Sequence, residues 1–482
     1  MRRWVRRHPF LVAAVAVIPV IAGYGWVASY RAWRGDLRAA GFVDEMSPPG
    51  SGDRVLVVAP HPDDETLGCG GLIQEAVARG AEVHVALMTN GDASELAVIF
   101  GERELPLSPQ AFVALGSKRQ QESLRALAAL GVPEDHVYFL GFPNNGLLAL
   151  WRPEHWPYSH LSRAPRTGVS LSPYELTVTP HAPYCGQQVL ADLVSVLRQV
   201  QPNLVFVTHP QDLHPDHWTT CCFVRYALAT VAARGGEWAR HAAVYGYLIH
   251  WPRYPAPARA AAGFPLLPPS GLANHGDWVR LPLSPPVRQA KLRSIRAYRS
   301  QEPGLDRLLL RFARANESFE RLSSTPMRIG GVRRWRDDNS HRRGLGGVEV
   351  TQLRLALTDA RAAAAELTGS SRPIGRDAYI ALDIRGWNDR GAPAITTIYE
   401  GVGGIVRAVQ VNESAAPALS VTRRQLGPGR VEITPVPLPP GTSAGRNFLV
   451  TCWGSVRDRL TDPAVVSLVA PVAAGDDPAA EE

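Results

Sequence analysis

Cysteine and unbalanced charge are both scarce in this sequence, and each shortage excludes a class of protein. The five cysteines are scattered and form no C-x-x-C pair, so neither a zinc ribbon nor a dithiol redox centre is indicated. We interpret them as buried or inert thiols, with no disulfide required. Charged residues make up 20% of the chain, a balance that fits neither wholesale disorder nor a polytopic membrane protein.

Excess positive charge is lacking from most of the chain, although the formal net charge is +7. Residues 1–40 hold seven arginines and one aspartate, a net of +6, so the remaining residues together carry only +1. A nearly neutral globular part does not favour a polyanionic partner. No nucleic-acid partner is therefore predicted.

Long apolar runs are absent apart from one near the N-terminus. Phe10 to Tyr30 carries no charge and follows four arginines, and about 20 apolar residues match a helix that crosses a bilayer. The pattern predicts a single-pass anchor in the cytoplasmic (inner) membrane, with the rest of the chain outside the cytoplasm. A cleaved signal peptide, which would make the protein secreted, and a buried helix of a cytoplasmic protein are the alternatives.

The 482 residues exceed one ordinary domain, and no internal repeat is visible. We predict a signal anchor and linker over 1–45, followed by an α/β domain over 46–330. A β-rich accessory domain is predicted over 345–472, because short strand-like runs there alternate with Gly, Pro and Asn, as in a sandwich. The small, acidic end at 473–482 is predicted to be a disordered tail.

Buried strands and helices alternate in the predicted α/β domain. The expected strands are Val55 to Ala59, Val83 to Met88, Val137 to Leu140 and Leu204 to Thr208. The expected helices lie near 70–78, 117–130, 188–199, from 216 onward, 287–298 and 305–322. This alternation predicts the α/β class with a Rossmann-like parallel sheet, to which the transmembrane helix and the sandwich-like domain are added. His84, on the second strand, is interpreted as a core histidine.

Two loops rich in histidine and carboxylate directly follow two of these strands. The first contains His61, Asp63, Asp64 and Glu65, and the second contains His209, Asp212, His214, Asp216 and His217. Loops at equivalent strand ends can converge, and three ligands with one open position are typical of catalytic zinc. Each loop alone could instead be a helix N-cap cluster.

The motifs resemble those of a known family. The run V-L-V-V-A-P-H-P-D-D-E-T-L-G-C-G-G from Val55 to Gly71 resembles the signature of the LmbE-like, or PIG-L, zinc deacetylases. D-L-H-P-D-H is similar to that family's second metal motif, Arg119 to Glu122 to its R-x-x-E helix, and Lys291 to Gln301 to its late helix ending in Ser-Gln. The resemblance covers about residues 53–325.

The resemblance implies zinc held by His61, Asp64 and His217, with Asp63 as the general base. We further expect His214 to stabilise the tetrahedral intermediate and Asp216 to orient His214.

Arg119 and Asn144 are the candidate substrate contacts. Arg119 has an ion pair with Glu122 as its alternative. Asn144 and Asn145 stand where many relatives carry an acidic residue, which removes charge but keeps hydrogen-bonding capacity.

A long loop from Trp151 to Tyr184 is expected to lie over the site. Its aromatic residues Trp151, Trp156 and Tyr158 are interpreted either as a sugar subsite or as cover for the core.

The predicted function is removal of the N-acetyl group from a GlcNAc-containing glycan, glycolipid or glycoconjugate by a zinc-dependent hydrolase. The predicted partners are this N-acetylated amino sugar and, through the N-terminal helix, the membrane. Alternatives are an amidase for a small thiol conjugate or other small amide, and a non-catalytic glycan-binding protein.

Overall fold

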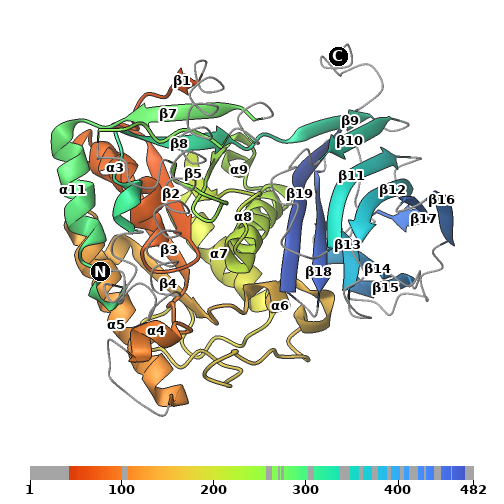
Figure 1. Ribbon diagram of the computed structural model, residues 1–482, viewed down its shortest axis with the longest axis horizontal. Helices are drawn as coiled ribbons and strands as arrows, with labels where there is room; N and C mark the ends of the chain where they lie inside the picture. Colours follow the sequence, from red (N-terminus) through yellow and green to blue (C-terminus); the bar gives the residue numbers. More distant parts are fainter. Residues whose placement is uncertain are drawn as a thin grey trace, which may run out of the picture.

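The computed structural model describes residues 43–472 with gaps. The gaps are 100–106, 257–262, 270–271, 273–275, 302–308, 329–330, 337–347, 358–361, 372–377, 388–391, 402–405, 412–421, 428–429, 439–446 and 457–458. The described part contains an eight-stranded sheet with helices on both faces and two further sheets in the C-terminal part (Figure 1).

The eight-stranded sheet has a parallel centre and an antiparallel margin. Its order is β1-β7-β8-β6-β5-β2-β3-β4, with β1 (Asp44–Glu45), β2 (Arg54–Ala59), β3 (Glu82–Thr89), β4 (Val137–Phe142), β5 (Leu204–Thr208), β6 (Ala243–Tyr247), β7 (Trp278–Pro282) and β8 (Asn316–Arg321). Strands β6, β5, β2, β3 and β4 run parallel, whereas β8 runs antiparallel to β6 and β7. The predicted Rossmann-like parallel sheet is this central part.

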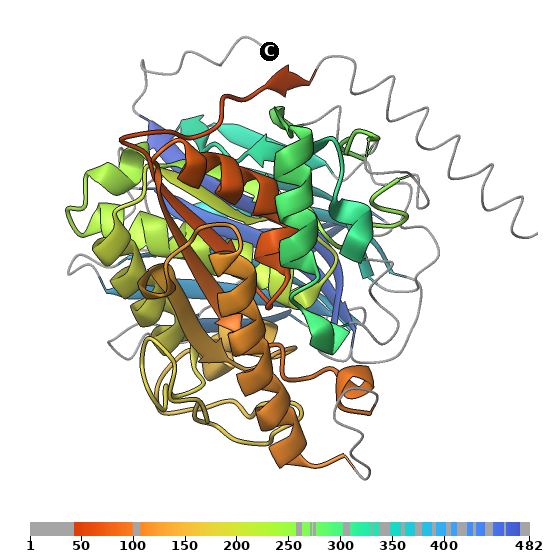
Figure 2. The same ribbon diagram turned by 90° about the vertical axis from the view of Figure 1, so that its left-hand side faces the viewer.

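Each face of the sheet is covered by its own helices. One face carries α3 (Asp64–Ala78), α5 (Pro109–Ala128) and α11 (Pro285–Ile295), which lie side by side in Figure 2; the other carries α7 (Gly186–Val200) and α8 (Pro215–Ala233). Shorter helices are α4 (Glu95–Ala97), α6 (Leu147–Trp151) and α9 (Trp238–His241). Strand β2 is apolar on both faces, since Val55 and Val57 pack in one core and Leu56 and Val58 in the other. Such a continuous apolar run is what a parallel strand buried on both sides requires.

The C-terminal part is a two-layer arrangement of antiparallel strands. One sheet has the order β10-β11-β12-β17-β16, with β10 (Val332–Arg336), β11 (Val348–Leu357), β12 (Ala362–Ser371), β17 (Arg430–Pro437) and β16 (Thr422–Gly427). The other has the order β15-β14-β13-β18-β19-β9, with β15 (Val406–Val411), β14 (Pro393–Gly401), β13 (Ala378–Trp387), β18 (Phe448–Val456), β19 (Arg459–Val472) and β9 (Thr325–Arg328). Side chains from both sheets share one core, including Leu353, Ile384 and Val450. A β-rich sandwich is thus present, and its pairing includes β9, which runs parallel to β19.

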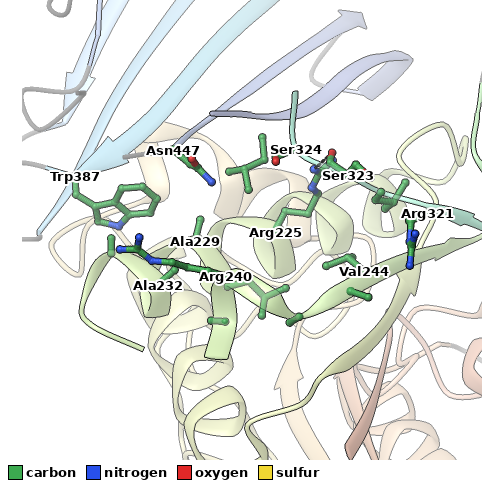
Figure 3. Close-up of a pocket in the computed structure, with 17 residues that line it drawn as sticks. Arg225, Ala229, Ala232, Arg240, Val244, Arg321, Ser323, Ser324, Trp387 and Asn447 are labelled. Atoms are coloured by element: carbon green, nitrogen blue, oxygen red, sulfur yellow. Dashed lines mark hydrogen bonds between the residues drawn. The ribbon is translucent and has the colours of Figure 1, made fainter. Parts of the chain in front are cut away.

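The outer face of the six-stranded sheet packs against α8. Trp453 lies 5.3 Å from Trp218 and Trp387 stacks on Tyr226 at 5.4 Å, both between ring centroids. Beyond this contact, a cleft of about 550 Å³ opens at the C-terminal end of α8, with Trp387 and Asn447 on the sandwich side and Arg225 on α8 (Figure 3). This cleft and the loop in which α8 begins therefore lie toward opposite ends of the helix.

The predicted helix over 305–322 is wrong in its second half. Residues 316–321 form strand β8, which pairs antiparallel with β6 and β7. Its alternate residues Glu317 and Phe319 are fully buried. Glu317 is bound there by the ammonium group of Lys291 and by two backbone amides of α3. These tertiary partners outweigh the local helical pattern.

The predicted transmembrane helix is corrected as well. A spanning helix needs about 20 largely apolar residues, and no helix in the described part of the chain has that length and apolar character. The predicted anchor from Phe10 to Tyr30 lies outside the described residues. The fold class therefore reduces to an α/β domain with a C-terminal β-rich region. The inner-membrane, single-pass location and the membrane as a partner are withdrawn with the helix.

Candidate metal centre

The two histidine-rich loops meet because the strands before them are neighbours. Strands β2 and β5 pair in parallel, with Val57 opposite Phe206, so their carboxyl ends lie at one edge of the sheet. The loop after β2 leads into α3 and carries His61 and Asp64; the loop after β5 leads into α8 and carries His217. All three side chains are buried.

Three donor atoms converge at this edge. Asp64 Oδ2 lies 3.0 Å from His61 Nδ1 and 3.0 Å from His217 Nε2, and the two imidazole nitrogens are 3.3 Å apart. Zinc bonds of about 2.0–2.1 Å in tetrahedral geometry place donors about 3.3 Å from each other. The donor set and its spacing therefore fit a zinc ion.

The outward nitrogen of each imidazole faces a second carboxylate. Asp216 Oδ2 lies 3.1 Å from His61 Nε2, and Asp212 Oδ2 lies 3.3 Å from His217 Nδ1. Both carboxylates are fully buried. Asp216 also accepts hydrogen bonds from the backbone amides of residues 145 and 147, and Asp212 from those of residues 214, 249 and 250. Such carboxylates fix the tautomer of a ligating histidine and raise its basicity.

Opposite charges within the cluster stabilise one another. Burial by itself lowers the pKa of His217, but Asp212 and Asp64 outweigh it and raise that pKa to about 10. Burial opposes ionisation of Asp64, yet His217 and His61 hold the pKa of Asp64 well below its usual range. The Asp64 carboxylate is thus ionised, as metal ligation requires, whereas a metal bound at His217 would displace the proton from that imidazole.

His214 is placed beside this centre as a neutral imidazole. Burial and the neighbouring His61 and His217 lower the pKa of His214 to about 3. Its Nδ1 accepts a hydrogen bond from the backbone N–H of Asp216 at 3.2 Å, so the proton is on Nε2. The expectation that the Asp216 side chain orients His214 is replaced by this backbone contact, because that carboxylate faces His61.

Asp63 adopts an unusual backbone conformation that separates it from Asp64. Its φ of 120° lies in a region that non-glycine residues rarely occupy, at a cost on the order of 1–3 kcal/mol. The Asp63 carboxylate lies on the wall of the cleft, with Oδ2 at 3.3 Å from Arg119 Nη2. Burial raises the pKa of Asp63 to about 8, although the Arg119 guanidinium opposes the shift.

Arg119 ties several segments together from helix α5. Its guanidinium donates to the backbone oxygens of Pro62 and Gly91, and a Cβ on Gly91 would lie only 2.1 Å from Arg119 Nη1. With its amide oxygen facing Arg119, Gln301 accepts from the same guanidinium. Glu122, the alternative partner considered for Arg119, instead accepts from the amide and hydroxyl of Ser300 at 2.9 and 2.6 Å. The R-x-x-E and Ser-Gln motifs thus pair with each other.

A cleft of about 440 Å³ opens over the centre, and sequence reasoning missed one of its walls. Asn144 and Asn145 line it near His214 and Asp63. The missed wall consists of Ile249, His250, Trp251, Tyr254, Leu309 and Phe312. The residues of this wall from Ile249 to Tyr254 follow β6, a strand that was not predicted from the sequence. A histidine and aromatic residues shortly after the end of a strand were the signal that could have revealed this wall.

The loop expected to cover the site does not line this cleft. Trp151 and Trp156 are buried, and both pack against Phe223 of α8 and against the guanidinium of Arg385. Tyr158 is half exposed and donates a hydrogen bond to Gln188. Of the two interpretations of these aromatic residues, cover for the core therefore applies to Trp151 and Trp156.

Fold and centre together define an α/β domain with a His/Asp cluster at the carboxyl edge of its parallel sheet. Residues 56–228 match the family model described as GlcNAc-PI de-N-acetylase, PIG-L. This part of the chain is a PIG-L, or LmbE-like, family domain.

Named relatives come from Mycobacterium, Mycolicibacterium and Rhodococcus. The 1D-myo-inositol 2-acetamido-2-deoxy-alpha-D-glucopyranoside deacetylase of Mycobacterium sp. (strain KMS) is 32% identical over 212 residues, which cover 42% of this chain and 56% of that protein. The protein of the same name from Mycolicibacterium smegmatis is 33% identical over 178 residues, covering 36% and 53%. The chain thus spans about half the length of the curated relatives it matches.

Among solved structures, the N,N'-diacetylchitobiose deacetylase from Pyrococcus horikoshii is 19% identical, with a TM-score of 0.36 and coverage of 59% of this chain and 89% of that one. A TM-score this low decides neither fold nor activity.

Proposed function

We propose that this chain is a zinc-dependent N-deacetylase that releases acetate from a GlcNAc-containing substrate. One observation carries the proposal: three buried donors converge within 3.3 Å of one another, and each of the two histidines among them faces a fully buried carboxylate. Histidines that only cap a helix would not need buried carboxylates beside their second ring nitrogens. The PIG-L domain supports the same reading.

His61, Asp64 and His217 would hold the zinc ion. Bound there, zinc supplies Lewis acidity, which activates a water molecule and polarises the acetyl carbonyl. One ring nitrogen of His250 lies within 4.8 Å of donor atoms of Asp64 and His217, and His250 lines the cleft, so it borders the space where the acetyl group would react.

Asp63 is the proposed general base. Its carboxylate lines the cleft one residue from a ligand, and Arg119 restrains it. Asp63 takes a proton from the attacking water and later delivers it to the departing amine. The Nε2–H of His214 donates to the oxygen that becomes negative as the tetrahedral intermediate forms.

The proposed substrate carries N-acetylglucosamine joined to a further hydroxylated or apolar group. The relatives are named for a GlcNAc-inositol substrate, and Asn144 offers a polar group on one side of the cleft. Because Arg119 is engaged by Asp63 and by the backbone of two loops, we assign its main role to positioning Asp63 and place substrate contact second.

The test is acetate release together with zinc content in two variants, offered GlcNAc-inositol and other GlcNAc conjugates. His217→Ala is expected to lose both zinc and acetate release, because a ligand is gone. Asp63→Asn is expected to keep zinc but lose about 10²- to 10⁴-fold in kcat, the usual contribution of a positioned base.

Glu75→Gln on the same helix α3 is the matched control, since Glu75 pairs with Arg79 near the surface, and it should leave both readouts unchanged. Acetate release at the parent rate in either site variant would contradict the proposal.

A further inference from the structure

Glu65 is a fully buried carboxylate in the first turn of α3, and the proposed reaction gives it no role. Its Oε2 accepts a hydrogen bond from the backbone N–H of Asp63 at 3.1 Å. Its Oε1 accepts from the hydroxyl of Thr66 at 3.1 Å and from that of Tyr298. The Glu65 carboxylate therefore connects the backbone of Asp63 to a phenol that comes more than 200 positions later in the chain.

The backbone of Asp63 has a conformation that needs support from other residues. Its φ of 120° is rare for a residue with a side chain, and such a conformation persists only where the surrounding structure fixes it. The Asp63 carbonyl accepts from the backbone amides of Thr66 and Leu67 at 3.0 and 2.9 Å, within the first turn of α3. Its N–H precedes the helix and has no partner there, so Glu65 Oε2 is the acceptor that holds this end of the turn.

Tyr298 fixes the direction of the Glu65 carboxylate. Its side chain is buried between α11 and the turn of 3-10 helix at Arg299–Gln301, and α11 packs against both α3 and α5. Besides Glu65, its hydroxyl lies 3.5 Å from Ser123 Oγ on α5. With Oε1 bound by this fixed phenol, Oε2 is directed to the N–H of Asp63.

We propose that Glu65 and Tyr298 are positioning residues for the general base. The phenol orients the Glu65 carboxylate, and that carboxylate holds the turn that presents the Asp63 side chain to the cleft. This inference rests on the proposed function, in which Asp63 takes the proton of the attacking water. Arg119 restrains the same side chain at its carboxylate end, with Nη2 at 3.3 Å from Oδ2, so the base is held at its backbone and at its tip.

The main experiment measures acetate release by Tyr298→Phe in two backgrounds, using the full-length, zinc-loaded protein and the GlcNAc conjugate on which the parent is most active. Phenylalanine keeps the buried ring and removes only the hydroxyl that donates to Glu65. In the parent background, kcat is expected to fall about 10- to 100-fold, because a small displacement of a catalytic group is costly. KM and zinc content should be unchanged, since no ligand or substrate contact is altered.

In the Asp63→Asn background, Tyr298→Phe is expected to leave the residual rate unchanged. The group that the phenol positions is already gone there, and residues that act as one unit have non-additive effects. A merely structural role of Tyr298 would instead lower the rate by the same factor in both backgrounds.

Two substitutions of Glu65 test the carboxylate itself. The amide oxygen of Glu65→Gln can accept from the Asp63 N–H while its NH₂ group donates to the phenol oxygen, so this variant should retain most of the parent kcat. Leucine has no acceptor, and Glu65→Leu should lose at least as much kcat as Tyr298→Phe. If Glu65→Leu does not fold, Tyr298→Phe still decides the proposal.

Tyr226→Phe is the matched control. Tyr226 is equally buried, but its hydroxyl donates to the backbone oxygen of Gly386 at 2.8 Å, far along α8 from the centre, so kcat should be unchanged. Parent-like kcat in Tyr298→Phe, or an equal loss in both backgrounds, would overturn the inference. Failure of the proposed function is distinguishable, because Asp63→Asn would then release acetate at the parent rate.

Discussion

The two histidine clusters at opposite edges of one sheet differ in which groups surround their imidazoles. At the carboxyl edge, His61 and His217 are buried and face the fully buried carboxylates of Asp216 and Asp212. At the amino edge, His84 and His136 face a phenol and a backbone carbonyl, and the carboxylate of Glu82 is half exposed. A buried carboxylate behind an imidazole raises its basicity and orders it. At the amino edge the two rings also stack face to face with centroids 4.0 Å apart, so their nitrogen lone pairs do not converge. The comparison teaches that donor types alone do not make a metal centre.

The largest expected effect separates the two clusters by zinc content. Dialysis against a strong chelator should remove zinc and abolish acetate release, because the proposed catalytic centre loses its ion. The measurement follows zinc content and rate in the same samples, for the parent protein and for His136→Gln, which leaves the catalytic centre intact and should behave as the parent does. Loss of zinc from His136→Gln before dialysis would show that the amino-edge cluster also binds the metal.

A smaller effect should follow from weakening the backing of one ligand. Asp212→Asn keeps the shape of the side chain but removes its charge beside His217, which should weaken zinc binding at the catalytic centre about 10- to 100-fold. As a positioning residue, Asp212 should affect apparent zinc affinity, and saturating zinc should largely restore kcat.

Asp216→Asn is the parallel variant at His61. An Asp212→Asn protein that binds zinc as tightly as the parent, yet is inactive, would show that Asp212 acts otherwise than through His217.

The smallest effect concerns a buried carboxylate with no histidine beside it. Burial raises the pKa of Asp192 on α7 to about 6, against the hydrogen bonds from Thr179 and Gln188. Its Oδ2 is buried with no hydrogen-bond partner among the described residues. A pKa raised in the folded state means that the stabilising contribution is complete below the unfolded pKa near 3.8 and is lost as pH rises through about 6.

Asp192→Asn should therefore gain on the parent as pH rises. The expected gain is about 1 to 3 kcal/mol in unfolding free energy above pH 7, shrinking toward zero near pH 4. Denaturant melts at several pH values measure it. A difference independent of pH would mean that charge burial is not the cause.

Much of the fold was accessible from local pattern. The strands predicted at 55–59, 83–88, 137–140 and 204–208 coincide closely with β2, β3, β4 and β5, because strands buried on both faces are continuous apolar runs. Residues 316–321 were assigned to a helix, because only pairing with β6 and β7 makes them a strand. The predicted transmembrane helix was also wrong as an element of the fold class.

The candidate site was also predictable only in part. His61, Asp63, Asp64, His214, Asp216 and His217 lie in two short contiguous loops, so their chemistry was visible in the sequence. The wall containing Trp251 and Tyr254 was not, because its residues follow a strand that was not recognised and meet the loops only in space.

By itself, the sequence determined the chemistry of the candidate centre and the positions along the chain of the strands that carry it, since both are written in contiguous residues. Tertiary structure decided which carboxylate faces which histidine, because Asp216 and His61 are 155 positions apart in the chain. It also turned Asp63 away from Asp64 through a backbone conformation of φ 120°, and it set His84 beside His136 through the register of two strands. Distances of this kind follow from strand pairing and packing, which no local pattern contains.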